Sequence, residues 1–226
     1  MKLTSLGSSA HAQSGFLRSR ARLAGLSALL VLSACALPDK PVRSTVYDFG
    51  AGVEAAASKQ QALPAAVALA DVEASAALDS TAVLYRLEYA DAQQPRPYAN
   101  ARWSMTPALL LQQRLRQRLA ALGVVLKPAQ AALLRNPETA APWLLQVELE
   151  EFSQSFSSPQ SSVGLLRLRA TVTQATAQGD KLLGQRSFAV QRPAPQADAA
   201  GGVRALTSAS DAVVDELLQW LATLRP

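Results

Sequence analysis

Reactive side chains and long apolar runs are scarce in this sequence of 226 residues. It contains one cysteine, Cys35, and one histidine, His11. The apolar run at residues 23–32 has about ten residues, whereas a helix that crosses a bilayer needs roughly 20. Neither a Walker loop nor a G-x-G-x-x-G run occurs, so the usual nucleotide-binding motifs are absent from the sequence.

The N-terminal segment has the pattern of an export signal. Three arginines between positions 18 and 22 precede the apolar run, and the small pair Ser33-Ala34 separates that run from Cys35. Leu32-Ser33-Ala34-Cys35 resembles the lipobox of bacterial lipoproteins. The resemblance implies cleavage before Cys35, diacylation of its sulfur and acylation of its new amino group. The alternative is an ordinary export signal followed by an unmodified thiol.

Cleavage changes which chemistry remains possible. Residues 35–226 number 192 and carry 18 Lys and Arg against 17 Asp and Glu, so their charge is nearly balanced and gives no reason to expect nucleic acid. His11 is removed and the thiol of Cys35 is taken by lipid. Histidine triads, Cys–His dyads and the usual zinc ligand sets are thereby excluded. We expect no enzymatic activity, no metal and no cofactor beyond the covalent lipid.

The position of the anchor predicts where the protein works. Two or more acyl chains hold a protein stably on a membrane. In enteric-type bacteria, an Asp after the lipidated cysteine tends to retain the protein at the inner membrane, and here that residue is Ala36. The sequence therefore favours the periplasmic face of the outer membrane, with the inner membrane as the alternative. Residues 35–46 are expected to form a lipidated tether, and Tyr47 lies at most roughly 40 Å from the anchor.

Alternation of apolar and polar residues predicts several strands. The clearest are residues 83–89 and a three-stranded meander at 143–150, 166–173 and 182–192, with turns at 157–159 and 179–180. On the polar face, Glu148 and Glu150 should lie opposite or near Arg167 and Arg169. Such pairs contribute roughly 0.2–1 kcal/mol each and explain these charges without catalysis. Shorter strands are expected at 45–50, 67–72, 98–104 and 124–127, with a turn at 95–97. Residues 51–63 are expected to form a loop or a frayed helix, and residues 128–142 a loop.

Two helices are expected. Thr106-Pro107 is typical of a helix start, with Thr as the cap and Pro in the first position, and the helix should end before Gly123. Arg114, Arg116 and Arg118 turn away from its leucine face; they are interpreted as a solvated surface, or alternatively as a surface that attracts anionic headgroups. The second helix spans about 202–224, with a broad apolar stripe and Asp211 and Asp215 on the other side.

These elements predict the fold class and the domain boundaries. We expect an α+β domain with a mostly antiparallel sheet and two amphipathic helices packed on one face. The domains are a lipoprotein signal peptide at residues 1–34, the lipidated tether at 35–46, and a single folded domain at 47–226.

An ordered set of residues then carries a family resemblance. Leu84-Tyr85-Arg86-Leu87 is followed by Tyr98, by Arg102-Trp103 and by Pro107, which opens a helix rich in Leu, Gln and Arg. This set, after a lipobox, resembles the ABC-type transport auxiliary lipoproteins, which include the paraquat-inducible protein C type. The resemblance covers essentially the whole processed chain.

The resemblance implies a function and partners. It implies a non-catalytic subunit, anchored in the outer membrane, that docks on a periplasmic MCE-domain protein. An inner-membrane permease and ATPase complete such systems, which move lipid between the membranes. The candidate partner-binding residues are Tyr85, Arg86, Tyr98, Arg102 and Trp103. Alternatively these aromatics pack in the core or on strand faces, and Arg86 and Arg102 pair with Glu88 and Asp91 or meet lipid phosphates.

Two other functions remain open at this point. One is an envelope assembly lipoprotein that chaperones or plugs an outer-membrane β-barrel partner. The other is a periplasmic hydrolase that uses carboxylates such as Glu148 or Asp91. The sequence leaves undetermined which lipid moves, in which direction, and whether the chain forms a homo-oligomer.

Overall fold

The computed structural model describes residues 43–51, 63, 65–133 and 141–225. The predicted signal peptide, the lipidation site Cys35, residues 36–42 of the tether and most of the loop expected at 51–63 lie outside the described residues. The strands are β1 (Thr45–Tyr47), β2 (Val67–Leu69), β3 (Glu73–Ala74), β4 (Ala82–Leu87), β5 (Asp91–Trp103), β6 (Val125–Leu126), β7 (Trp143–Ser158), β8 (Ser161–Thr176) and β9 (Gly179–Pro193). The helices are α2 (Pro107–Ala120), α3 (Pro128–Leu133) and α4 (Ala199–Thr223).

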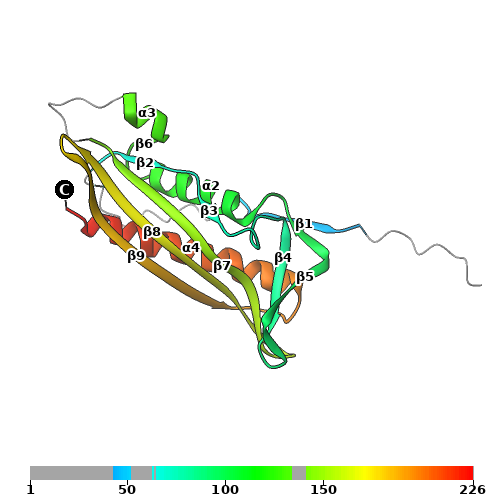
Figure 1. The fold of residues 1–226 in the computed structure, drawn as a ribbon. Coiled ribbons are helices and arrows are strands. Elements are labelled where there is room, and N and C mark those ends of the chain that lie inside the picture. The colour runs from blue at the N-terminus through cyan, green and yellow to red at the C-terminus, as the bar shows by residue number, and fades with distance from the viewer. Residues whose placement is uncertain (1–42, 52–62, 64, 134–140, 226) are drawn as a thin grey trace, which may run out of the picture. The chain divides into compact units, whose positions relative to one another are not determined.

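Strand β7 is the axis of one mixed sheet (Figure 1). On one edge β2, β3 and β4 run parallel to β7, one after another along its length, while β8 pairs antiparallel on the other edge and β9 follows β8. Strand β5 is antiparallel to β4, β1 is parallel to β5, and β6 is parallel to β2. The expectation of a mostly antiparallel sheet is therefore wrong in this detail. The parallel partners are short strands from distant segments, whose direction no local pattern reveals.

The meander β7–β8–β9 is present, with strands longer than the alternation indicated. Each of the three has 15 or 16 residues. A register shift between Leu149 and Glu151 puts both Glu150 and Glu151 away from the core and returns Phe152 to it. A shift of this kind is a β-bulge, and it ends the simple period of two at the point where the strand was expected to stop.

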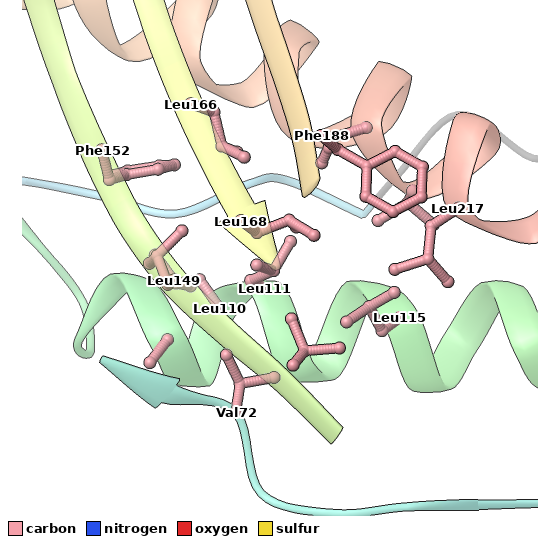
Figure 2. Close-up of a cluster of buried hydrophobic side chains, with 14 of the residues drawn as sticks. Val72, Leu110, Leu111, Leu115, Leu149, Phe152, Leu166, Leu168, Phe188 and Leu217 are labelled. Carbon is pink, nitrogen blue, oxygen red and sulfur yellow. The ribbon is translucent and has the colours of Figure 1, made fainter. Parts of the chain in front are cut away.

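Both long helices cover the same face of the sheet. Their apolar side chains join those of β7, β8 and β9 in one core, as Figure 2 shows for Leu111 and Leu115 of α2, Leu217 of α4 and Leu149 and Leu168 of the sheet. Each of these leucines is completely buried. The α+β class and the placement of the two helices therefore follow from the amphipathic patterns. The predicted loop at 128–142 instead begins with α3, a short helix without buried residues.

The starts of the helices differ in how they are capped. Thr106 occupies the N-cap position of α2, but its side chain accepts no capping hydrogen bond, so only the role of Pro107 in the first turn is as expected. Helix α4 begins three residues earlier than predicted. Its N-cap is Asp198, whose carboxylate accepts a hydrogen bond from the backbone N–H of Gly201 at 2.6 Å.

Helix α4 approaches β8 and β7 very closely at two glycines. A Cβ atom on Gly164 of β8 would lie 2.6 Å from backbone atoms of Ala205 and Leu206. A Cβ atom on Gly202 would lie 2.0 Å from the side-chain oxygen of Gln154. The absence of a side chain at these positions sets the distance between the helix and the sheet.

Candidate partner-binding surface

The hairpin β4–β5 carries the candidate residues, in the part of the sheet where β4 pairs with the second half of β7. Its turn lies at residues 88–90, and the expected turn at 95–97 is part of β5. The rings of Tyr85 and Tyr98 lie 4.6 Å apart between centroids, and Tyr85 meets the edge of Phe156 at 6.0 Å. Both tyrosines are half-buried, so each presents part of its ring to solvent.

A buried glutamine supports these tyrosines. The hydroxyl of Tyr98 donates to Oε1 of Gln154 at 2.8 Å, and Nε2 of Gln154 donates to Oγ of Ser162 at the same distance. Gln154 is completely buried. Burial raises the pKa of Tyr98 well above its usual range, with smaller contributions from Tyr85 and Asp198. The Tyr98 hydroxyl therefore stays protonated and keeps its donor role.

Arg86 fastens the hairpin to β7. Its guanidinium pairs with Glu151 at 3.2 Å and donates to the carbonyls of Ala92 and Gln93 at 3.3 and 3.4 Å. Arg86 was expected to pair with Glu88 or Asp91, and this expectation is wrong because its ion-pair partner is Glu151. The two terminal nitrogens of Arg86 thus make three hydrogen bonds within the chain, and its side chain stays 25% exposed.

Arg102 is the candidate with the most accessible charge. It is exposed, pairs in register with Val46 of β1, and forms no ion pair with any described residue. Val46 is 62% exposed. Arginine is enriched at protein interfaces, so the exposed Arg102 remains a candidate contact.

Trp103 lies in the core. It is 2% exposed and packs against Phe49 and Phe152, with ring centroids at 5.7 and 5.5 Å. A partner cannot reach this ring in the folded protein. The candidates that keep exposed atoms, which we call the hairpin surface, are Tyr85 and Tyr98 on the face of the hairpin that is turned toward α4, and Arg86 and Arg102 on the opposite face.

The arginines of α2 have a role that the helical pattern did not reveal. Arg114 is 4% exposed; it donates to Asp211 at 2.7 Å and to the carbonyl of Phe49 at 2.6 Å. Arg118 pairs with Asp215. The interpretation of these two arginines as a solvated face is therefore wrong, because they join α2 to α4. Burial raises the pKa of Asp211, and this effect exceeds the lowering by Arg114 and Arg118.

Charged side chains on the outer face of the meander form ion pairs between neighbouring strands. Arg169 lies directly opposite Glu148 in the register and pairs with it at 3.8 Å and with Glu150 at 2.5 Å. Arg167 lies opposite Glu151 instead, because the bulge in β7 shifts the register by one residue. The expected cross-strand arrangement of these charges is thus confirmed apart from that shift.

Clusters of metal-ligating side chains and hollows are the features of the described residues in which a ligand could bind. They contain no group of three His, Cys, Asp or Glu side chains that could hold a metal ion. Three hollows on this part of the chain have volumes of about 120, 180 and 130 Å³. Ligand pockets usually exceed roughly 300 Å³. In the same described residues, no helix combines the length and apolar character needed to cross a bilayer.

Solved structures place this fold in a known class. A crystal structure of a Xanthomonas campestris protein of the family DUF330 is similar, with a TM-score of 0.63, 18% identity, and coverage of 78% of this chain and 94% of that protein. An uncharacterized protein matches with a TM-score of 0.56, 13% identity, and coverage of 79% and 99%. The chain therefore has the fold of a class of small α+β domains that contains these proteins.

The family follows from the sequence itself. Residues 47–217 match the family described as ABC-type transport auxiliary lipoprotein component, and the chain belongs to that family. The resemblance inferred from residues 84–107 is thereby confirmed. A comparison with curated protein sequences gave no match.

Proposed function

We propose that this chain is a non-catalytic accessory subunit of an MCE-type ABC transport system that moves lipid between the two membranes. The lipid on Cys35 holds it at the periplasmic face of the outer membrane, and the folded domain docks on the MCE-domain protein. The observation that carries the proposal is the family match over residues 47–217.

The hairpin surface is the docking site in this proposal. It presents two half-buried tyrosines on one face of the hairpin and the exposed Arg102 on the other, and Tyr and Arg dominate binding energy at protein interfaces. The hairpin is also held rigidly, since Arg86 ties it to Glu151 and Tyr98 to Gln154. A pre-organised surface loses less entropy when a partner binds.

Co-purification tests the proposal. The full-length lipoprotein, extracted in mild detergent with an affinity tag, should bring with it an MCE-domain protein together with its permease and ATPase. Arg102→Glu should lower the recovery of the MCE-domain protein by roughly tenfold, because a charge reversal at an interface costs at least one strong contact.

A charge reversal elsewhere is the matched control. Lys127→Glu changes an exposed residue just after β6, outside the hairpin surface, and should leave the recovery unchanged. Repeated isolation of an intact transporter without this chain would contradict the proposed function. Recovery of an outer-membrane β-barrel protein in place of the MCE-domain protein would support the envelope assembly alternative.

A further inference from the structure

The outer edge of β9 is an open strand edge. Strand β9 pairs with β8, and no other strand of the described residues pairs with β9, which is the outermost strand of the meander (Figure 1). An unpaired edge presents backbone N–H and C=O groups that can pair with another extended chain.

The register identifies which backbone groups face outward. The N–H of Ala194 donates to the carbonyl of Ser162, so these opposite residues form a hydrogen-bonded pair. Along an antiparallel ladder, hydrogen-bonded residue pairs alternate with non-hydrogen-bonded pairs. From Val163–Pro193 to Thr171–Gln185 the register is continuous, so the non-bonded residues of β9 are those at odd positions. The backbone N–H and C=O groups of these residues point away from β8. The residues are Gln185, Ser187, Ala189 and Gln191.

Pro193 agrees with this assignment. It falls in a non-bonded pair with Val163, where a backbone N–H would point to the open edge. Proline is tolerated at such positions because no ladder hydrogen bond is lost. One edge group already has a contact, since the guanidinium of Arg192 donates to the carbonyl of Gln191 at 3.1 Å.

Among the described residues, no strand covers the middle of this edge. Two devices that protect an edge are at its ends: the register shift beside Gly184 and the proline at 193. Between them, the outward-facing positions carry short uncharged side chains, Ser187 and Ala189, both exposed. A second strand could therefore approach without a steric or charge barrier at the backbone.

The charges along the strand indicate what kind of chain fits. Lys181, Arg186 and Arg192 lie along β9 with one acidic residue, Asp180, and these three cations form no ion pair with any described residue. The Arg186 guanidinium lies over the ring of Phe188 at 4.9 Å. A second copy of β9 would bring the same cations together, which disfavours self-pairing.

We propose that the β9 edge, residues 185–191, binds an extended, acidic segment of a partner protein by adding it to the sheet as a further strand. Backbone hydrogen bonds at the odd positions provide the affinity, and Lys181, Arg186 and Arg192 select for acidic side chains. This surface is separate from the hairpin surface, and the inference holds whether or not the partner is an MCE-domain protein.

A peptide experiment tests this edge directly. The probe is a fluorescent peptide of about nine residues that alternates Glu with Val, titrated against the full-length lipoprotein in detergent. We expect saturable binding, and roughly tenfold weaker binding both for the same peptide with Lys in place of Glu and for a backbone N-methylated version. Ala189→Pro should weaken binding by a similar factor, because it removes an outward N–H. Ala189→Val keeps that N–H and should bind as the unchanged protein does.

Hydrogen exchange provides a second measurement that needs no variant. Adding the acidic peptide should slow exchange of the amides of Ser187, Ala189 and Gln191, whereas the even-numbered amides are already bonded to β8. Binding that survives both N-methylation and Ala189→Pro, or no saturable binding, would overturn the proposal. A dimer that Ala189→Pro dissolves would also overturn it, in favour of a second copy of this chain.

Discussion

Gly164 stands at a point where strand β8 and helix α4 lie very close together. A Cβ there would lie 2.6 Å from the backbone of Ala205 and Leu206, a distance at which one of the two elements must move. We expect Gly164→Ala to lower the free energy of unfolding by about 1–3 kcal/mol, the usual cost of overpacking a core. Urea denaturation of the domain measures this change.

Gly123 supplies the control for that substitution. It follows α2, and a Cβ there would meet no atom within 4 Å. Gly123→Ala should leave the unfolding midpoint nearly unchanged. Equal effects of the two substitutions would show that the contact at Gly164 does not limit stability.

Asp198 is the second residue on which α4 depends. Its carboxylate accepts the N–H of Gly201 at 2.6 Å, which satisfies one of the free donors in the first helical turn. Asp198→Ala should cost about 0.5–2 kcal/mol of unfolding free energy, whereas Asp198→Asn should keep most of the cap. Thermal denaturation of both variants decides the matter, and an Ala variant as stable as the Asn variant would rule out a capping role.

At the scale of elements, two ion pairs connect α2 and α4, and they explain why one sequence interpretation was wrong. Arg114 and Arg118 are spaced four apart, as are Asp211 and Asp215, so each pair forms one row on its helix. A row of arginines on an isolated helix has the pattern of a solvated face. Only the packing of the second helix, far along the chain, converts that row into a contact.

The pKa of Asp211 makes this contact testable by pH. Because burial raises that pKa above its ordinary value of 3.8, the folded protein keeps a proton on Asp211 over a pH range in which the unfolded chain has lost it. The stability contributed by this group therefore falls as the pH rises from about 3.8 through the folded pKa. The stability of the unchanged protein relative to Asp211→Asn should fall over this window.

Urea denaturation of both proteins at a series of pH values measures that difference. Asn keeps a side-chain oxygen that can accept from Arg114 but does not titrate, so the comparison isolates the carboxyl group. A relative stability that instead rises with pH would mean that Arg114 and Arg118 outweigh burial and lower the pKa of Asp211.

The helices and strands differ in how well the sequence could predict them. The meander, the two long helices and the shared core were predictable because their apolar residues follow periods of two or about 3.6 over many residues. The roles of Gln154 and Glu151, which hold the hairpin, were not predictable from the sequence. The bulge after Leu149 breaks the alternation just before these residues. Strands of two or three residues, such as β3 and β6, contain too few side chains to show any period.

For the molecule as a whole, the structure separates two kinds of aromatic residue that looked alike in the sequence. Tyr85 and Tyr98 lie on an exposed hairpin, whereas Trp103 is enclosed by Phe49 and Phe152. The residues that carried the family resemblance thus serve both the core and the surface. The resemblance identified the family correctly, but only the packing could show which of its residues a partner can touch.

The remaining whole-molecule prediction concerns the anchor. If Cys35 is lipidated, the full-length chain should sediment with membranes. Cys35→Ser should release it to the soluble fraction, because the serine at position 35 carries no acyl chain.

Ala36→Asp should shift the protein from the outer-membrane fraction to the inner-membrane fraction, whereas Ala36→Ser, a small uncharged change, should not. Density-gradient fractionation with mass spectrometry of the N-terminal peptide measures both outcomes. An unmodified thiol on membrane-bound protein would mean that something other than the lipid holds the chain there, and the docking role would then have to explain its location.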